Sequence, residues 1–250
     1  IGGRLGFFLF YRFEEFLADP LVFFRFQEGG MASHGGILGV VAFTFYYSWR
    51  NKISWPHIGD CLVPIAPVGI GFGRLANFVN GELIGRPTTV SWAVQFSEEM
   101  KLGPDHGLDR ETYYQIIDEV DQVLPEAQVT TADQVIEAAR HVPEVLPILA
   151  SYLTPRHPSQ LYQAFLEGFL IAGVLMVVRL KWKDLPYGLL TGVFFIIYAI
   201  MRMVGETFRE PDATLLLGLT RGQFYSSFMI LIGAAFVLYA IRASSREGHS

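Results

Sequence analysis

Runs of about twenty apolar residues recur along this chain, and they constrain its fold more than any other feature. An α-helix of about 20 residues crosses the hydrocarbon core of a bilayer. Only 17% of the 250 residues are charged, against about 25% in soluble domains. We therefore expect an all-α, polytopic membrane helix bundle. The predicted spans are 1–11 (partial), 31–49, 58–78, 161–178, 185–204 and 223–241.

Basic residues in the short connections predict how these spans are oriented, because Lys and Arg concentrate in cytoplasmic loops. They occur around 50–52, at Arg179, Lys181 and Lys183, and beyond 241. Alternation of the spans places these three regions on one side, so we expect a cytoplasmic C-terminus.

The segment of about 87–155 then lies on the opposite side, and it is too long to be a structureless loop in a compact protein. The runs "DRETYYQIIDEVDQVL" and "TTADQVIEAARHV" have helical spacing, and Thr131 is a plausible start for the second helix. We expect a small, partly helical cap inserted into one membrane domain. Because Ile1 lies within an apolar run, we also expect an N-terminal helix to be missing or truncated.

The single cysteine, Cys61, lies in an apolar run. It allows no intrachain disulfide and no metal-binding spacing. Free cysteines are usually buried, so we expect a small core residue.

Polar residues at membrane depth carry the functional signal. The stretch "GFGRLANFVNGELIGR" places Arg74, Asn77 and Glu82 just after an apolar run, and a charge at the bilayer centre costs about 3 kcal/mol. Pro64 and Pro67 predict an interrupted helix here, which a membrane protein tolerates where the helix lines a cavity or is buried. The alternative is an interfacial helix end with a snorkelling arginine.

Two histidines accompany this stretch in other segments. His34 lies in "SHGGILG", whose glycines permit close approach of a backbone or a ligand; the alternative is a structural histidine. His157, in "PRHPSQLY", lies at the mouth of a span, where it is either a cap or a catalytic group.

The stretch "YAIMRMVGETFREPD" predicts a polar stripe within about 80° of a helix surface. Its members are Tyr198, Arg202, Glu206 and Arg209. Such a stripe faces the bundle or an aqueous cleft, and the alternative is a structural Arg202–Glu206 pair. Paired arginines suit a phosphate, which in a membrane bundle suggests a phospholipid head group. We expect this phosphate to stabilise Arg74 together with Glu82, Glu206 or the nearby asparagines.

Four stretches, "HGGILG", "GRLANFVNGELIGR", "RHPSQLYQA" and "YAIMRMVGETFREPD", occur in an order that resembles the prolipoprotein diacylglyceryl transferase family of the bacterial inner membrane. The resemblance runs from Gly2 to the final span. It implies transfer of the diacylglyceryl group of phosphatidylglycerol to the lipobox cysteine of a prolipoprotein signal peptide, forming a thioether and releasing glycerol phosphate. It also implies a periplasmic cap, a protein embedded in the lipid bilayer, and no cofactor, metal or nucleic acid.

The resemblance carries specific roles onto this sequence. The implied catalytic residues are His34, Arg74, His157, Tyr198 and Arg202. The implied phosphatidylglycerol-binding residues are Arg74, Asn77, Glu82, Gly85, Arg202 and Glu206.

The identity of the general base stays open among His34, His157 and no base at all. The alternative function is a secondary transporter for an anionic or phospholipid-like substrate, since transporters also use broken helices and buried charges. A transporter usually carries an internal repeat in its hydropathy, and this sequence has no evident one.

Overall fold

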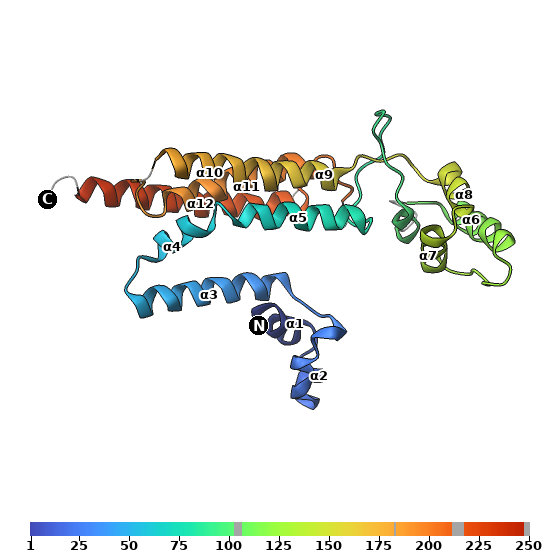
Figure 1. Ribbon diagram of the computed structural model, residues 1–250, viewed down its shortest axis with the longest axis horizontal. Coiled ribbons are helices and arrows are strands. Elements are labelled where there is room, and N and C mark those ends of the chain that lie inside the picture. The colour runs from blue at the N-terminus through green and yellow to red at the C-terminus, as the bar shows by residue number, and fades with distance from the viewer. Residues whose placement is uncertain (103–106, 183, 212–217, 248–250) are drawn as a thin grey trace. The chain divides into compact units, whose positions relative to one another are not determined.

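The computed structural model describes residues 1–102, 107–182, 184–211 and 218–247, and it divides into two compact units (Figure 1). The first unit is Ile1–Leu62 and the second is Val63–Ser250. Lys183 and Asp212, which lie in two of the predicted patterns, fall outside the described residues. Throughout the described ranges the regular elements are helices, so the prediction of an all-α membrane protein is confirmed.

The first unit consists of short helices around one long helix. Its elements are α1 (Gly2–Tyr11), α2 (Phe13–Ala18), η1 (Pro20–Phe24), η2 (Phe26–Glu28), α3 (Ser33–Asn51) and α4 (Trp55–Leu62). The backbones of α1 and α3 touch, since a Cβ built on Gly35 would lie 2.5 Å from the carbonyl oxygen of Gly2. The glycines after His34 therefore permit the close approach that their spacing predicted.

Arg4 organises the turns between α1 and α3. This side chain is buried, donates to the carbonyl oxygens of Val22, Arg25 and Gly29, and lies over the Phe8 ring. One buried side chain thereby holds the backbone of three turn residues in place.

The membrane helices of the second unit pack side by side (Figure 1). They are α5 (Ala66–Val79), the continuous run of α9 (Ser159–Gln163), η4 (Ala164–Leu170) and α10 (Ile171–Lys181), then α11 (Leu189–Glu206) and α12 (Arg221–Glu247). Small residues set their spacing: a Cβ built on Gly192 of α11 would lie 2.7 Å from the carbonyl oxygen of Gly233 of α12. Such contacts are typical of helices packed in membranes.

Three helices within the described residues are long and apolar enough to cross a membrane, and the number becomes four if α4 and α5 form one broken span. The three are Ser159–Lys181, Leu189–Glu206 and Arg221–Ser245. The helix breaks after Leu62 and resumes at Ala66, where Pro64 and Pro67 predicted an interruption. The 19-residue α3 is less apolar, and its crossing stays a prediction.

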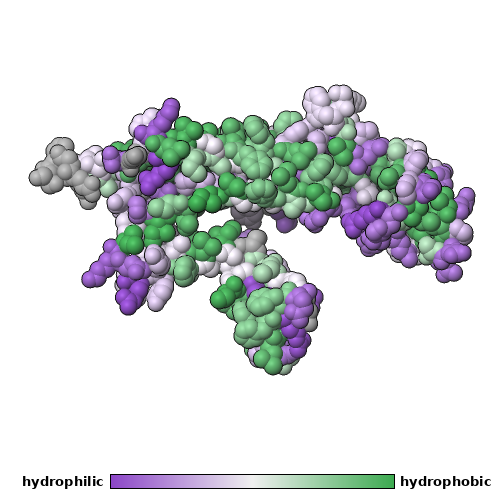
Figure 2. All heavy atoms as spheres, viewed as in Figure 1, coloured by the Kyte–Doolittle hydropathy of each residue, from purple (hydrophilic) through white to green (hydrophobic). Residues whose placement is uncertain are grey.

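The predicted cap forms a separate helical layer of the second unit. Its elements are η3 (Ser97–Lys101), α6 (Arg110–Val123), α7 (Ala132–His141) and α8 (Val145–Tyr152), which share an apolar core. Thr131 begins α7 with a capping box to Gln134, as the sequence predicted. Hydrophilic residues gather over α6–α8, and hydrophobic residues line the longer helices (Figure 2).

The prediction that Cys61 is buried is wrong. Its side chain is exposed, with Sγ 4.0 Å from Nε2 of His57. The reason is local, because α4 buries the adjacent Asp60, and consecutive helical residues point in different directions.

We predict that Ile116→Ala lowers the free energy of opening of the cap by about 2–5 kcal/mol, because Ile116 is fully buried in its core. Hydrogen exchange of the α6 and α8 amides measures this loss. Gln115→Ala, on the exposed side of α6, is the matched control and should change exchange little. Equal protection in both variants would contradict the cap core described above.

Candidate functional site

Three of the predicted site residues meet at one carboxylate, that of Glu167 on η4. Nε and Nη2 of Arg74 lie 3.3 and 3.0 Å from Oε2 of Glu167, and Nη1 of Arg202 lies 3.5 Å from the same oxygen. The hydroxyl of Tyr198 donates to it over 3.4 Å. Helices α5, η4 and α11 therefore each contribute to a single polar cluster, which we call the two-arginine cluster.

The charges of this cluster do not cancel. Two guanidinium groups face one carboxylate, so an excess of one positive charge remains. The Glu167 side chain is fully buried, while 13% of the Arg74 side chain and 21% of the Arg202 side chain are exposed. The partly exposed edges of the two arginines therefore carry the charge that Glu167 leaves unbalanced.

Backbone packing brings these helices together. Gly71 of α5 lies against Gly168 of η4, where an added Cβ would lie 2.4 Å from the Gly71 Cα. Arg74 follows Gly71 by about one turn, and Glu167 immediately precedes Gly168. The segment η4 is a π-helix, a wider helix that is frequent at functional sites.

The prediction that Glu82, Glu206 or an asparagine holds Arg74 is wrong, because Glu167 does so. Glu82 lies beyond the end of α5, where Asn77 donates to it over 2.7 Å. Glu206 lies 3.9 Å from Arg209 and packs against Gly222 in the first turn of α12.

Glu167 itself was missed by the sequence reasoning, although a signal existed. It is an isolated acidic residue within the apolar run "QAFLEGFL", and ionisable residues inside membrane segments are functional candidates. Only the fold shows that this carboxylate faces both arginines.

The predicted polar stripe is correct for only part of its length. Tyr198 and Arg202 face Glu167, and Arg202 forms its ion pair with that residue. The alternative of a structural Arg202–Glu206 pair is therefore not needed to explain how Arg202 is held. The helix ends at Glu206, and Arg209 lies in a turn whose backbone pairs with Gly85. Placing Arg209 on a helical face was therefore wrong.

Residues 84–86 run between two other segments of chain. The Arg86 N–H donates to the Phe208 oxygen, and the His157 N–H donates to the Arg86 oxygen, both over 3.0 Å. A Cβ built on Gly85 would lie 2.1 Å from the carbonyl oxygen of His157. Gly85 therefore has a steric role in bringing these backbones together.

The side chain of His157 lies among aromatic rings. Its Nδ1 is 3.3 Å from the hydroxyl of Tyr162, which accepts a hydrogen bond of 2.7 Å from Trp92, and its ring meets Phe208 edge to face. Of the predicted site residues, His34 alone belongs to the first unit, where it is exposed at the start of α3.

A buried ion pair that the sequence reasoning missed joins the cap to this loop. Nη2 of Arg156 lies 2.7 Å from Oε1 of Glu99, and Nη1 donates to the Gly85 oxygen over 3.1 Å and lies 3.3 Å from Glu210. Glu99 also accepts from the N–H of Thr154. The sequence reasoning singled out the neighbouring His157, whereas Arg156 forms the buried ion pair.

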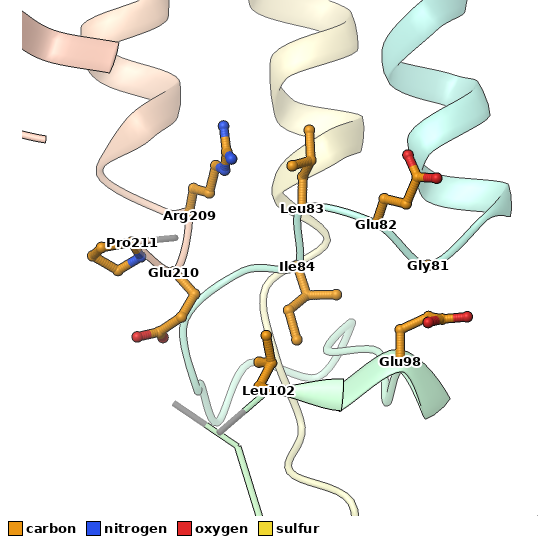
Figure 3. Close-up of a pocket in the computed structure, with 9 residues that line it drawn as sticks. All are labelled: Gly81, Glu82, Leu83, Ile84, Glu98, Leu102, Arg209, Glu210 and Pro211. Atoms are coloured by element: carbon orange, nitrogen blue, oxygen red, sulfur yellow. The ribbon is translucent and has the colours of Figure 1, made fainter. Parts of the chain in front are cut away.

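A pocket of about 310 Å³ lies beside the loop. It is lined by Gly81, Glu82, Leu83, Ile84, Glu98, Leu102, Arg209, Glu210 and Pro211. Figure 3 shows Glu82 and Arg209 directed toward the helices. Leu83 has φ +56°, a backbone conformation that is uncommon for a residue with a side chain.

In the part of the chain that the structure describes, no group of three His, Cys, Asp or Glu residues is arranged to hold a metal ion.

Comparisons with known proteins show which family this chain resembles. A family model described as prolipoprotein diacylglyceryl transferase matches residues 1–239. The chain is 36% identical over 247 residues to the phosphatidylglycerol–prolipoprotein diacylglyceryl transferase of Proteus mirabilis, covering 97% of this chain and 72% of that protein. The enzyme of the same name from Erythrobacter litoralis is 38% identical over 254 residues, with 98% and 70% covered. That from Bdellovibrio bacteriovorus is 36% identical over 285 residues, with 100% and 80% covered.

We predict that Gly85→Ala destabilises the protein by about 1–3 kcal/mol, because the added methyl group collides with the backbone at His157. Thermal unfolding in detergent measures the change. Gly73→Ala is the matched control, since nothing lies within 4 Å of its added Cβ, and alanine favours a helix more than glycine does. A Gly85→Ala protein as stable as the control would contradict the close approach.

We also predict unequal effects for two neighbouring glutamates. Glu99→Ala should cost about 3–5 kcal/mol of stability, because it leaves the charge of Arg156 buried without this partner. Glu98→Ala should cost about 1 kcal/mol or less, because its ion-pair partners, Lys101 and Arg140, have exposed side chains. Chemical denaturation of both variants tests the difference, and equal losses would argue against the buried pair.

Proposed function

The chain belongs to the prolipoprotein diacylglyceryl transferase family, and on that basis we propose that it transfers the diacylglyceryl group of phosphatidylglycerol to the lipobox cysteine of prolipoproteins. The observation that supports this most is the two-arginine cluster, in which Arg74 and Arg202 share one carboxylate. Such a cluster suits a lipid phosphate, because guanidinium groups offer forked donors that match phosphate oxygens.

In the proposed reaction, the bond between the terminal glyceryl carbon of the diacylglycerol and its phosphate oxygen breaks. The cysteine sulfur forms a thioether with that carbon, and the bonding electrons leave with glycerol phosphate. Negative charge therefore grows on the leaving phosphate. Arg74 and Arg202 stabilise this charge, with Glu167 holding both side chains in position before the reaction begins.

The thiol must lose its proton, because a free cysteine with a pKa near 8.5 is only a few per cent thiolate at neutral pH. We propose His34 as the base, since histidine is the side chain that most often acts as a general base in enzymes. His157 is the second candidate. Tyr198, which donates to Glu167, helps to orient the arginines.

The remaining site residues are proposed to bind the lipid head group. Asn77 holds Glu82 at the outer end of α5, which places a pair of polar side chains beside the loop. Gly85 lets that loop pass close to His157, and Glu206 lies between α11 and α12.

We further propose that the protein is a multi-pass protein of the bacterial inner membrane, with a cytoplasmic C-terminus and a periplasmic cap of about residues 87–155. The basic connections and the apolar helices support this orientation. The cap, on this view, is an insertion in a single membrane domain that covers 1–250. A lipobox signal peptide would meet the lipid within the bilayer.

We predict that Arg202→Ala lowers kcat by roughly 10²–10³-fold, because one donor to the developing phosphate charge is lost. The assay combines purified protein, phosphatidylglycerol and a lipobox peptide, and follows glycerol phosphate release together with peptide mass. Arg140→Ala, an exposed arginine of the cap, is the matched control and should keep full activity.

His34→Ala in the same assay tests the base. A fall of roughly 10²–10⁴-fold is expected for loss of a general base, and near-normal activity would instead assign that role to His157 or to the arginines alone. No thioether from the wild type, despite phospholipid binding, would reject the transferase and favour the transporter.

A further inference from the structure

A row of buried amide and carboxylate groups follows one face of α9 and η4. Its members are Gln160, Gln163 and Glu167, spaced by three and four residues, and each side chain is fully buried. Within the described residues, several of their atoms lack a hydrogen-bond partner. These atoms are Oε1 of Gln160, Oε1 and Nε2 of Gln163, and Oε1 of Glu167.

Each end of the row is attached to the site described above. Gln160 donates through Nε2 to the carbonyl oxygen of Glu82 over 2.6 Å. Glu167 accepts from Arg74 through Oε2, and the same oxygen forms the ion pair with Arg202. Gln163 lies between them, and it alone leaves both of its polar atoms unpaired.

Burying such a row of unpaired polar atoms destabilises the protein unless a polar group binds to them. A buried polar atom that makes no hydrogen bond costs about 1–3 kcal/mol, and more than about 90% of buried polar groups in native proteins are paired. Four such atoms along a single helix face therefore indicate a polar partner.

The chemistry of the two neighbouring polar groups indicates what kind of partner fits. A Cβ built on Gly205 would lie 2.9 Å from Cγ of Gln163 and 3.6 Å from both Nε2 of Gln163 and Oε1 of Glu167. The Gln163 side chain therefore packs against the Gly205 backbone, with its amide donor on the same side as the unpaired Glu167 acceptor. A hydroxyl group can accept from the first and donate to the second, whereas an ammonium group can only donate. A polyol therefore satisfies this pair better than an amine.

We propose that Gln163, together with Oε1 of Glu167, binds the hydroxyl groups of the glycerol head group while Arg74 and Arg202 hold its phosphate. Gln163 is thus a specificity-determining residue for the head group, and this inference rests on the proposed function. Gln160 and Glu167 are seven positions apart, which corresponds to about 10 Å at the rise of an α-helix, and this length is ample for a glycerol phosphate. The partly exposed arginines provide access from one end.

The test compares two lipids that differ only in these hydroxyls: phosphatidylglycerol and phosphatidylpropanol, whose propyl head group has the same carbon chain. Wild type should prefer phosphatidylglycerol at least tenfold in kcat/KM, because one net hydrogen bond of ~1.4 kcal/mol corresponds to a factor of ten. Gln163→Met keeps the length of the side chain but removes its polar atoms. It should lose most of this preference through slower use of phosphatidylglycerol, with phosphatidylpropanol unaffected.

Two further variants separate head-group selection from general damage. Arg202→Ala should slow both lipids by a similar factor, because both carry the phosphate. Gln115→Met, on the exposed face of α6, should change neither rate. Equal use of the two lipids by wild type would overturn the inference, as would a Gln163→Met enzyme with its preference intact, the result expected if the row holds only water.

Binding gives a readout that does not depend on turnover. Thermal stabilisation of the wild type should be greater with phosphatidylglycerol than with phosphatidylpropanol, and Gln163→Met should reduce this difference. A wild type that shows the binding difference but forms no thioether would overturn the proposed function while supporting the head-group site. A wild type that forms thioether but shows no lipid preference in either assay would overturn only the head-group site.

Discussion

The burial of Glu167 between two arginines is the interaction on which the second unit depends. Burying either guanidinium at membrane depth without a partner would cost much free energy. One fully buried carboxylate is the partner of both. Because the carboxylate is shared, α5, η4 and α11 must keep one mutual arrangement. The same sharing leaves a positive excess, and the phosphate site proposed above is based on that excess.

Glycine makes this arrangement sterically accessible. Gly71 and Gly168 let α5 reach η4, and Gly192 and Gly233 let α11 reach α12. In a bilayer, helices associate through close packing and polar contacts, because lipid is as apolar as the side chains it replaces. Glycines at a few positions let the helices approach closely, and this approach brings the polar side chains within hydrogen-bonding distance.

The cap is joined to the site by a different device. Arg156 connects Glu99 of the cap with Gly85, in the segment 84–86 that follows α5, and with Glu210 beyond α11. A buried ion pair adds less net stability than its geometry suggests, because both charges lose their hydration. Removing one partner nevertheless lowers the stability strongly, since the other charge is left buried without it. The consequence is a loop whose backbone is positioned from three sides, beside the pocket that Glu82 and Arg209 line.

The sequence by itself determined the class of protein, the helices of the cap and the interruption near Pro64, because apolar runs, helical spacing and prolines have direct local consequences. It also singled out Arg74, Tyr198 and Arg202, which meet at one carboxylate. It could not determine the partners of those charges. Arg74 was assigned to Glu82, Glu206 or an asparagine, whereas its partner is Glu167, 93 residues away in the sequence. Arg209 was placed on a helix that ends at Glu206, and Cys61 was taken as buried although Asp60 turns inward. Pairing and facing depend on which helices pack together, and only the tertiary structure decided that.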